Sequence, residues 1–134
     1  MVDPELEAAL TVLLRDLSAP GGVVPDVRDV PWQPYPGTAS CMLHAADGSG
    51  MGVFIELGRP TAEQVAHLAD QVQEWAVEAL WTLSASTSWP PCPHHPGSHP
   101  LQAEEHDGRA VWCCPVDRHV VTEVGRLGVQ DASS

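Results

Sequence analysis

Apolar residues recur at helical spacing near the start of the chain and predict an amphipathic helix. Asp3 and Pro4 are residue types typical of a helix cap and of the first helical position. The apolar stripe that follows consists of Leu6, Leu10, Leu13, Leu14 and Leu17. Such a stripe favours a helix that packs on the core of its own chain, and a dimerising helix is the alternative.

A second and longer helical pattern lies in the middle of the chain. Its apolar positions, spaced by three or four residues, are Val65, Leu68, Val72, Trp75, Ala76, Ala79, Leu80 and Leu83. Thr61 and Gln64 have the spacing of a capping box, so we expect Thr61 to cap this helix. We expect the helix to lie across a sheet, with Trp75 and Trp81 buried in the core or against the C-terminal part of the chain.

Strand-like alternation of apolar and polar residues fills the segment between the two helical patterns. Residues 38–45 and 51–57 are predicted strands, joined by a turn with the sequence Asp-Gly-Ser-Gly. The proline-rich stretch 23–35 is expected to be an edge strand or a crossing segment, because proline lacks a backbone N–H group. Its Trp32 and Tyr35 are expected to cover the sheet.

The C-terminal part of the chain predicts a second hairpin. Residues 101–105 and 109–113 alternate as strands, and the intervening His-Asp-Gly is a turn because Asp-Gly is a strong hairpin signal. The apolar residues from Val120 to Leu127 fit either a short helix or a further strand.

The charge of the chain narrows its possible partners. The 134 residues carry 18 acidic side chains against six basic ones, a formal net charge of −12, and all the basic residues are arginines. This excess disfavours binding to nucleic acid and to anionic membranes, and a protein partner would need a basic surface. Because the N-terminus is acidic and no run approaches the ~20 apolar residues of a membrane span, we expect neither a signal peptide nor a membrane anchor, and a cytoplasmic location.

Cysteine and histidine gather in one stretch, which points to a metal site. Three of the four cysteines and five of the seven histidines lie between Trp89 and His119. Cys92 and His95 form a Cys-x-x-His pair, and proline follows both Cys92 and Cys114, so the chain turns after each sulfur. Zn²⁺ favours four tetrahedral thiolate and imidazole ligands, and the hairpin would return Cys114 to the level of Cys92.

The residues alone leave the fourth ligand open. Cys92, His95 and Cys114 are the firmest candidates; His99 and His119 compete for the fourth position, with Asp117 behind them because carboxylates are less common structural ligands.

Two other cysteines are expected to stay outside the site. Cys113 would point to the opposite face of the strand from Cys114 and would be a small buried hydrophobic residue. By the same rule Cys41 and His44, three residues apart on a strand, are expected to be a packed cysteine and a separate histidine. A Cys92–Cys114 disulfide is the alternative to metal, disfavoured where thiols stay reduced.

Together these patterns predict an α+β fold. A small antiparallel sheet would pack against one long helix and an N-terminal helix, followed by a C-terminal zinc-ribbon-like hairpin lobe stabilised by Zn²⁺. The expected division is residues 1–86 for the α+β domain, 87–128 for the lobe, with a polar hinge at 84–88, and 129–134 for a frayed tail.

The zinc-binding stretch also resembles a known group of proteins. The pattern Cys-Pro-x-His-Pro-x-x-His-Pro-Leu from Cys92, then Trp-x-Cys-Pro from Trp112 and Val-x-x-Val-Gly-x-Leu from Val121, is similar to small actinobacterial proteins with a C-terminal zinc-ribbon-like motif after a short α/β domain. The similarity covers about the last 45 residues. The resemblance implies that His99 is the fourth ligand in preference to His119, and it implies no activity.

Motif absences favour a non-enzymatic protein with structural zinc that acts through protein contacts. The chain lacks Gly-x-Ser-x-Gly, His-Glu-x-x-His, Walker and Rossmann patterns. One alternative is a metal-dependent hydrolase-like or deaminase-like enzyme that uses spare side chains, namely His94, His106, His119, Glu104 or Glu105. The deaminase signature His-x-Glu with Pro-Cys-x-x-Cys is not matched. Another alternative is a redox or metal sensor that uses the thiol of Cys113.

Overall fold

The fold of the chain is α+β, as the sequence predicts. The computed structural model describes residues 3–19, 22–30, 36–82, 89–95 and 99–127, and within them two helices and two three-stranded antiparallel sheets. In chain order the elements are α1 (Pro4–Leu17), β1 (Asp26–Arg28), β2 (Thr38–His44), β3 (Gly50–Glu56), α2 (Thr61–Thr82), β4 (Gln102–His106), β5 (Arg109–Cys113) and β6 (Val120–Glu123). The predictions for Trp32, Tyr35, the hinge at 84–88 and the tail at 129–134 lie outside the described residues.

The first sheet has the order β1-β2-β3, and its inner face alternates along the central strand as expected. The buried side chains on β2 and β3 are Ala39, Cys41, Leu43, Val53 and Ile55. β1 is the predicted edge strand in the proline-rich stretch and is only three residues long. His44 ends β2 with its Nδ1 atom 3.3 Å from the carbonyl oxygen of Gly48 in the turn, apart from the buried Cys41.

Helix α1 begins and packs as its sequence predicts. The carboxylate of Asp3 accepts a 2.9 Å hydrogen bond from the backbone N–H of Glu5, which satisfies one of the free donors of the first turn. The buried residues of the helix are Leu6, Ala9, Leu10, Leu13, Asp16 and Leu17. The apolar stripe is therefore covered within this chain, and Leu14 lies at its partly buried border.

Helix α2 differs from the sequence-based predictions at its N-terminus and at Trp81. The helix starts at Thr61 itself, and Gln64 does not close a capping box: its side-chain nitrogen donates 2.9 Å hydrogen bonds to Oε1 of Glu5 and to the backbone oxygen of Glu56. Trp75 is buried as expected, whereas Trp81 is 75% exposed. Trp81 follows the buried Leu80, and one residue turns about 100° around the helix axis, so its side chain leaves the core.

A glutamine on α2 covers the free edge of β3. The backbone N–H of Phe54 donates to Oε1 of Gln71 at 3.0 Å, and Nε2 of Gln71 donates to the backbone oxygen of Phe54 at 2.8 Å. The side-chain amide thus takes the place of a further strand. Unpaired strand edges invite association with other chains, so this pair protects the sheet.

The second sheet has the order β4-β5-β6 and begins with the predicted hairpin. Asp107 and Gly108 both have positive φ angles, 51° and 77°, as a two-residue hairpin turn of the Asp-Gly type requires. The sequence left the apolar residues from Val120 to Leu127 open between a short helix and a strand. The structure shows a strand, β6, which pairs with β5. Gln73 of α2 donates through Nε2 to the backbone oxygens of Trp89 and Leu101, which joins this lobe to the long helix.

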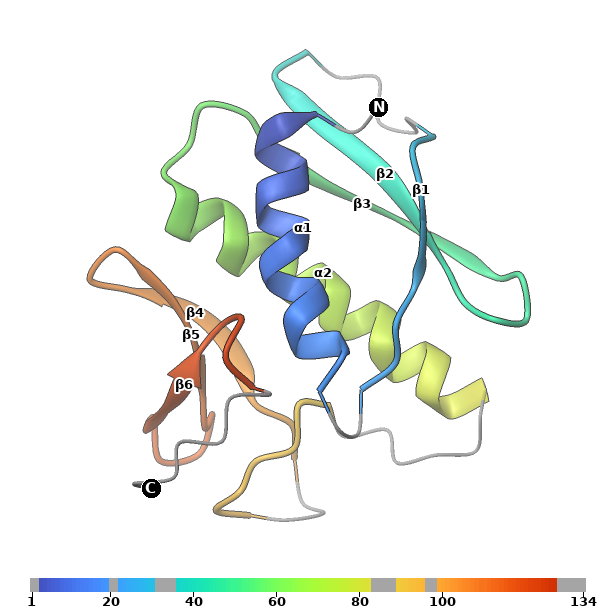
Figure 1. The fold of residues 1–134 in the computed structure, drawn as a ribbon. Coiled ribbons are helices and arrows are strands. Elements are labelled where there is room, and N and C mark those ends of the chain that lie inside the picture. Colours follow the sequence, from blue (N-terminus) through green and yellow to red (C-terminus); the bar gives the residue numbers. More distant parts are fainter. Residues whose placement is uncertain (1–2, 20–21, 31–35, 83–88, 96–98, 128–134) are drawn as a thin grey trace.

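The two sheets share one hydrophobic core. In Figure 1 the two helices cross between them, with β1–β3 on one side and β4–β6 on the other. One continuous set of buried residues contains members of both helices and of both sheets, including Trp89, Leu101 and Trp112 from the lobe. The division of the chain into two domains at residue 86 stays a prediction.

A buried aspartate connects α1 to the lobe, and the sequence analysis missed it. The carboxylate of Asp16 is fully buried and accepts hydrogen bonds from Nε1 of Trp112 at 2.8 Å and from the backbone N–H groups of Gly125 at 2.7 Å and Leu127 at 2.9 Å. Asp16 follows Leu13 by three residues, so its place on the apolar stripe was the available signal.

Gly125 permits the close approach of that turn to α1. Its φ angle is 100°, and a Cβ atom there would lie 2.6 Å from Cγ1 of Val12. A larger residue would therefore be strained and would push the turn away from Asp16.

Within the described residues, no helix combines the length and the apolar character that a membrane crossing requires.

Candidate metal centre

The loop before β4 places Cys92 and His95 side by side. The backbone N–H of His95 donates to the carbonyl oxygen of Cys92 at 3.2 Å, which closes a tight turn over the Cys-x-x-His spacing. The loop is held in place by an isolated bridge between Pro91 and Pro100 and by a 2.8 Å hydrogen bond from the N–H of Leu101 to the oxygen of Pro90. The bridge at Pro100 therefore places the preceding residue, His99, beside the turn that holds Cys92 and His95.

Cys114 follows the last residue of β5 and reaches the same point from the other side. Its backbone N–H donates to the oxygen of His119 at 2.8 Å, and its own oxygen accepts from the N–H of Arg118 at 2.9 Å. These two bonds close the short loop 114–119 after the proline. The hairpin thus returns Cys114 to the level of Cys92, as predicted.

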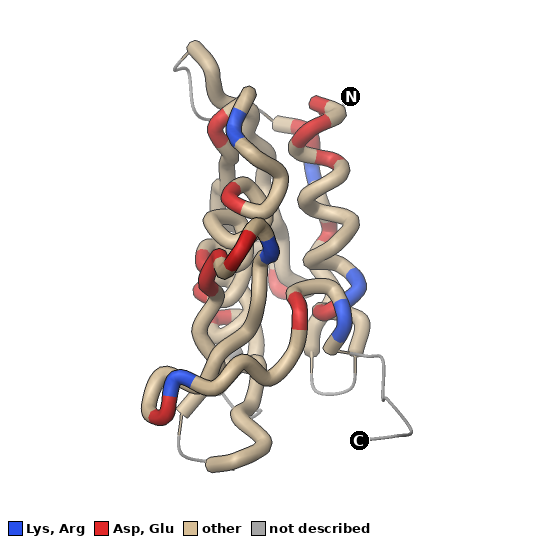
Figure 2. The backbone as a smooth tube through the Cα atoms, turned by 90° about the vertical axis from the view of Figure 1, so that its left-hand side faces the viewer, with Lys and Arg blue, Asp and Glu red and all other residues tan. Residues whose placement is uncertain are grey.

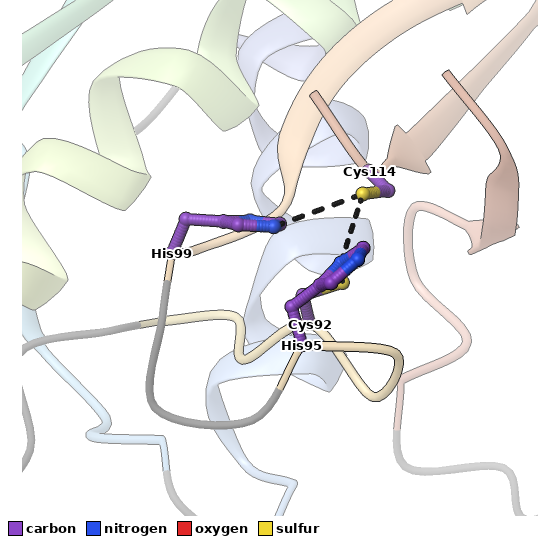
Figure 3. Close-up of side chains that lie close together, drawn as sticks. All are labelled: Cys92, His95, His99 and Cys114. Carbon is purple, nitrogen blue, oxygen red and sulfur yellow. Dashed lines mark hydrogen bonds between the residues drawn. The ribbon is translucent and has the colours of Figure 1, made fainter. Parts of the chain in front are cut away.

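The four predicted side chains lie together with the spacing that a tetrahedral ion imposes. Their ligand atoms all lie within 4.8 Å of one another, and Figure 3 shows the four side chains pointing toward a common centre. Nδ1 of His95 is 3.6 Å from Sγ of Cys92 and 3.5 Å from Sγ of Cys114, and the latter sulfur is 3.8 Å from Nε2 of His99. Tetrahedral zinc with ordinary bond lengths separates sulfur from nitrogen by about 3.6 Å.

One nitrogen of the group approaches two sulfurs at once. An imidazole nitrogen carries at most one hydrogen, and Nδ1 of His95 lies at nearly equal distances from the sulfurs of Cys92 and Cys114. A shared ion at the centre would account for both distances. The residues present therefore fit a metal with a preference for sulfur and nitrogen donors.

The ring of His99 is oriented for metal binding. Its Nδ1 atom lies 3.1 Å from the carbonyl oxygen of Pro100, an acceptor to which a protonated Nδ1 donates. This bond places the ring hydrogen on Nδ1 and leaves the lone pair of Nε2 free to face the centre, as in most histidine–metal sites. The supporting role of Pro100 could not be found from its residue type, because any residue offers a carbonyl oxygen.

The two sulfurs are shielded from water. Cys92 is 1% exposed and Cys114 is fully buried, while His95 and His99 are half-buried. Burial raises the pKa of the Cys114 thiol, and the backbone N–H groups of Asp117 and Val116 act in the opposite direction. Peptide N–H groups beside sulfur stabilise the thiolate form, which is the form that binds metal.

The other candidates for the fourth ligand lie outside the cluster. The ring of His119 lies against that of His94, with centroids 5.2 Å apart, and both residues are exposed. Asp117 accepts a 2.9 Å hydrogen bond from the backbone N–H of His119, and this bond lowers the pKa of its carboxyl group. Among the three candidates, the structure brings His99 to the predicted partners.

The remaining cysteines are consistent with the expectation that they bind no ion at this centre. Cys113 is buried, and its register on β5 places it on the opposite face of the hairpin from Trp112 and Cys114. All four cysteines are free thiols, so the alternative disulfide between Cys92 and Cys114 is not formed.

Comparison of the chain with protein-family models, with curated proteins and with solved structures finds no match.

Proposed function

We propose that this chain is a zinc-binding protein whose ion is structural and which acts through contacts with another protein. The observation that carries the zinc proposal is the group of sulfur–nitrogen distances between 3.5 and 3.8 Å around one point. Two sulfurs and two imidazole nitrogens in a tetrahedral arrangement are typical of zinc. A reducing environment keeps thiols free to bind metal, and the four free cysteines agree with a cytoplasmic location.

A structural role follows from the donor set. Two cysteines and two histidines supply four protein ligands, which leaves no position for a reacting water molecule. The ion would join the loop before β4 to the end of β5, in addition to the packing of Trp89 against Trp112. Zinc binding contributes about 10–16 kcal/mol of apparent free energy in zinc-finger peptides.

The proposed partner surface is an acidic groove between α2 and the lobe. The groove has a volume of about 550 Å³, with an acidic row on α2 at helical spacing formed by Asp70, Glu74 and Glu78. Val77, Leu101 and other apolar residues lie beside this row. Figure 2 shows Asp and Glu at many more positions than Lys and Arg over the described backbone. A partner segment rich in arginine or lysine with apolar residues between them fits this surface.

Metal analysis tests the structural ion. The purified protein is expected to retain zinc after dialysis against a weak chelator, and Co²⁺ substitution is expected to give the absorption of a tetrahedral site with two thiolates. Cys114→Ser should lose this metal and the ordered environment of the nearby tryptophans. Cys41→Ser, which alters a buried cysteine of the first sheet, should keep the metal. A wild-type protein that stays fully ordered without bound metal would contradict the proposal.

Peptide binding tests the groove. A labelled peptide that alternates arginine with leucine is expected to bind in a fluorescence-anisotropy assay, and a glutamate-for-arginine version is not. The double variant Asp70→Asn, Glu74→Gln should weaken binding about fivefold or more, a change of about 1 kcal/mol. The matched double variant Glu7→Gln, Asp47→Asn removes the same charge at exposed positions elsewhere. Equal weakening by both double variants would show only a general charge effect and would count against the groove.

A further inference from the structure

A second group of metal-ligating side chains lies on the other face of the β4–β5 hairpin. Glu104 and His106 are two residues apart on β4, and the register pairs Gln102 with Cys113, so all three side chains share one face. One carboxylate oxygen, one ring nitrogen and the sulfur of Cys113 lie within 4.8 Å of one another. None of the three belongs to the first cluster.

One carboxylate oxygen of this group is buried without a hydrogen-bond partner in the described part of the chain. Oε2 of Glu104 is buried and has no hydrogen-bond partner among the described residues. The other oxygen, Oε1, lies 2.8 Å from Nε2 of His106 and 3.5 Å from a guanidinium nitrogen of Arg118. A buried carboxylate oxygen without a donor costs about 1–3 kcal/mol or more, so a bound cation would remove an existing penalty.

The arginine beside this group is mostly exposed. The side chain of Arg118 is 68% exposed, and the contact of its guanidinium group is with Oε1 of Glu104, whereas Oε2 has no hydrogen-bond partner among the described residues. Cys113 is 1% exposed, and Glu104 lies on the same face of the hairpin.

We propose that Glu104, His106 and Cys113 form a second site for a divalent transition metal, with zinc the best match. One oxygen, one nitrogen and one sulfur are ligands that zinc accepts, and three protein ligands leave the fourth position for water or for a ligand from outside. Cys113 binds as thiolate and releases its proton to solvent. Without metal, Nε2–H of His106 donates to Oε1 of Glu104; on binding, the ion replaces this hydrogen, and the ring hydrogen is then carried by Nδ1. The site is weaker than the first because it offers one thiolate in place of two.

The two sites would use consecutive cysteines of one strand end. Cys114 faces the centre with Cys92, and Cys113 faces Glu104, because neighbouring residues on a strand point to opposite faces. The first ion would hold the hairpin in place, and the second would lie on its outer face with an open position. Only the second site could bind an external ligand directly to the metal.

Metal stoichiometry tests the inference. Reduced, metal-free protein titrated with Co²⁺ is expected to bind two equivalents, the second more weakly and with the absorption of a single thiolate. Glu104→Gln and His106→Gln are each expected to abolish the weaker equivalent and leave the tighter one unchanged. The matched control Glu105→Gln, on the opposite face of β4, should keep both. Cys41→Ser, which alters a cysteine outside both groups, should also keep both equivalents.

Three results would overturn the second site. The first is saturation of the wild-type protein at one equivalent. The second is an unchanged weaker equivalent in both Glu104→Gln and His106→Gln, which would place that metal elsewhere. The third is its loss in the double variant His94→Gln, His119→Gln, which would assign it to the exposed histidine pair.

Discussion

Replacement of Asp16 by alanine is expected to weaken the attachment of the C-terminal lobe to α1. The carboxylate accepts three hydrogen bonds, from the indole of Trp112 and from the backbone N–H groups of Gly125 and Leu127. These bonds join residues that are far apart in the sequence, and they replace apolar contact at that point of the helix stripe. Their loss therefore affects the tertiary arrangement without changing any secondary structure directly.

The size of the effect follows from the number of donors left without an acceptor. Each buried unpaired donor costs about 1–3 kcal/mol, so Asp16→Ala should lower the free energy of unfolding by about 3 kcal/mol or more. Asp16→Asn keeps one oxygen, which can face Trp112 and Gly125 at the Oδ2 position and leave only Leu127 without an acceptor. The asparagine variant should thus lose about a third as much, a distinct and measurable step on a total stability of about 5–15 kcal/mol.

Urea unfolding monitored by tryptophan fluorescence measures both variants in the zinc-loaded protein. Amide hydrogen exchange supplies a local readout, because the N–H groups of Gly125 and Leu127 should lose protection in Asp16→Ala. Asp70→Ala, the same substitution at an exposed position of α2, is the control and should change stability by less than about 0.5 kcal/mol. A destabilisation no larger than that of the control, or equal losses in the alanine and asparagine variants, would refute the reasoning.

Three further predictions use other contacts. Burial raises the pKa of Cys41 to about 11 from its ordinary 9.0, so its alkylation at neutral to mildly basic pH, followed by mass spectrometry, should be about 100-fold slower in the native than in the unfolded protein; comparable rates would contradict this. Gln71→Ala should cost about 1–3 kcal/mol in thermal unfolding because both backbone groups of Phe54 lose their partner, while Glu74→Ala at an exposed position should cost much less. Burial also raises the pKa of Asp16, so the native state holds its proton more tightly than the unfolded state. The stability that wild type gains over Asp16→Asn should therefore fall as pH rises from the unfolded-state pKa of about 3.9 through the raised native pKa, and a gain that grows with pH would reverse the sign.

Much of the architecture was predictable because its signals are local. The helical stripe of α1, the cap at Asp3 and the Asp107-Gly108 turn each depend on residues within a few positions of one another. The predicted capping box was wrong because the side chain of Gln64 has a hydrogen-bond partner far away in the sequence. Gln64 bonds to Glu5, far away in the sequence, and so does not complete the local capping box that its spacing predicts.

The candidate centre was recognisable from residue types and spacing alone. Thiol and imidazole groups are rare enough that Cys92, His95 and Cys114, punctuated by proline, indicated a shared ion before any geometry was known. The choice between His99 and His119 needed the path of the loop, since both lie at a plausible distance along the chain. The structure places His99, next to the bridge at Pro100, beside the other three side chains, and His119 outside their cluster.

By itself, the sequence determined the elements, the acidic character and the gathering of metal ligands, because periodicity, charge and donor chemistry belong to the residues themselves. Only the tertiary structure decided that Asp16 holds the lobe to α1, that Gln71 covers the edge of β3, and that Glu104 meets Cys113. Each of these contacts joins segments whose separation in the chain says nothing of their separation in space. The contacts of Asp16 and Gln71 also satisfy polar groups that packing has removed from water.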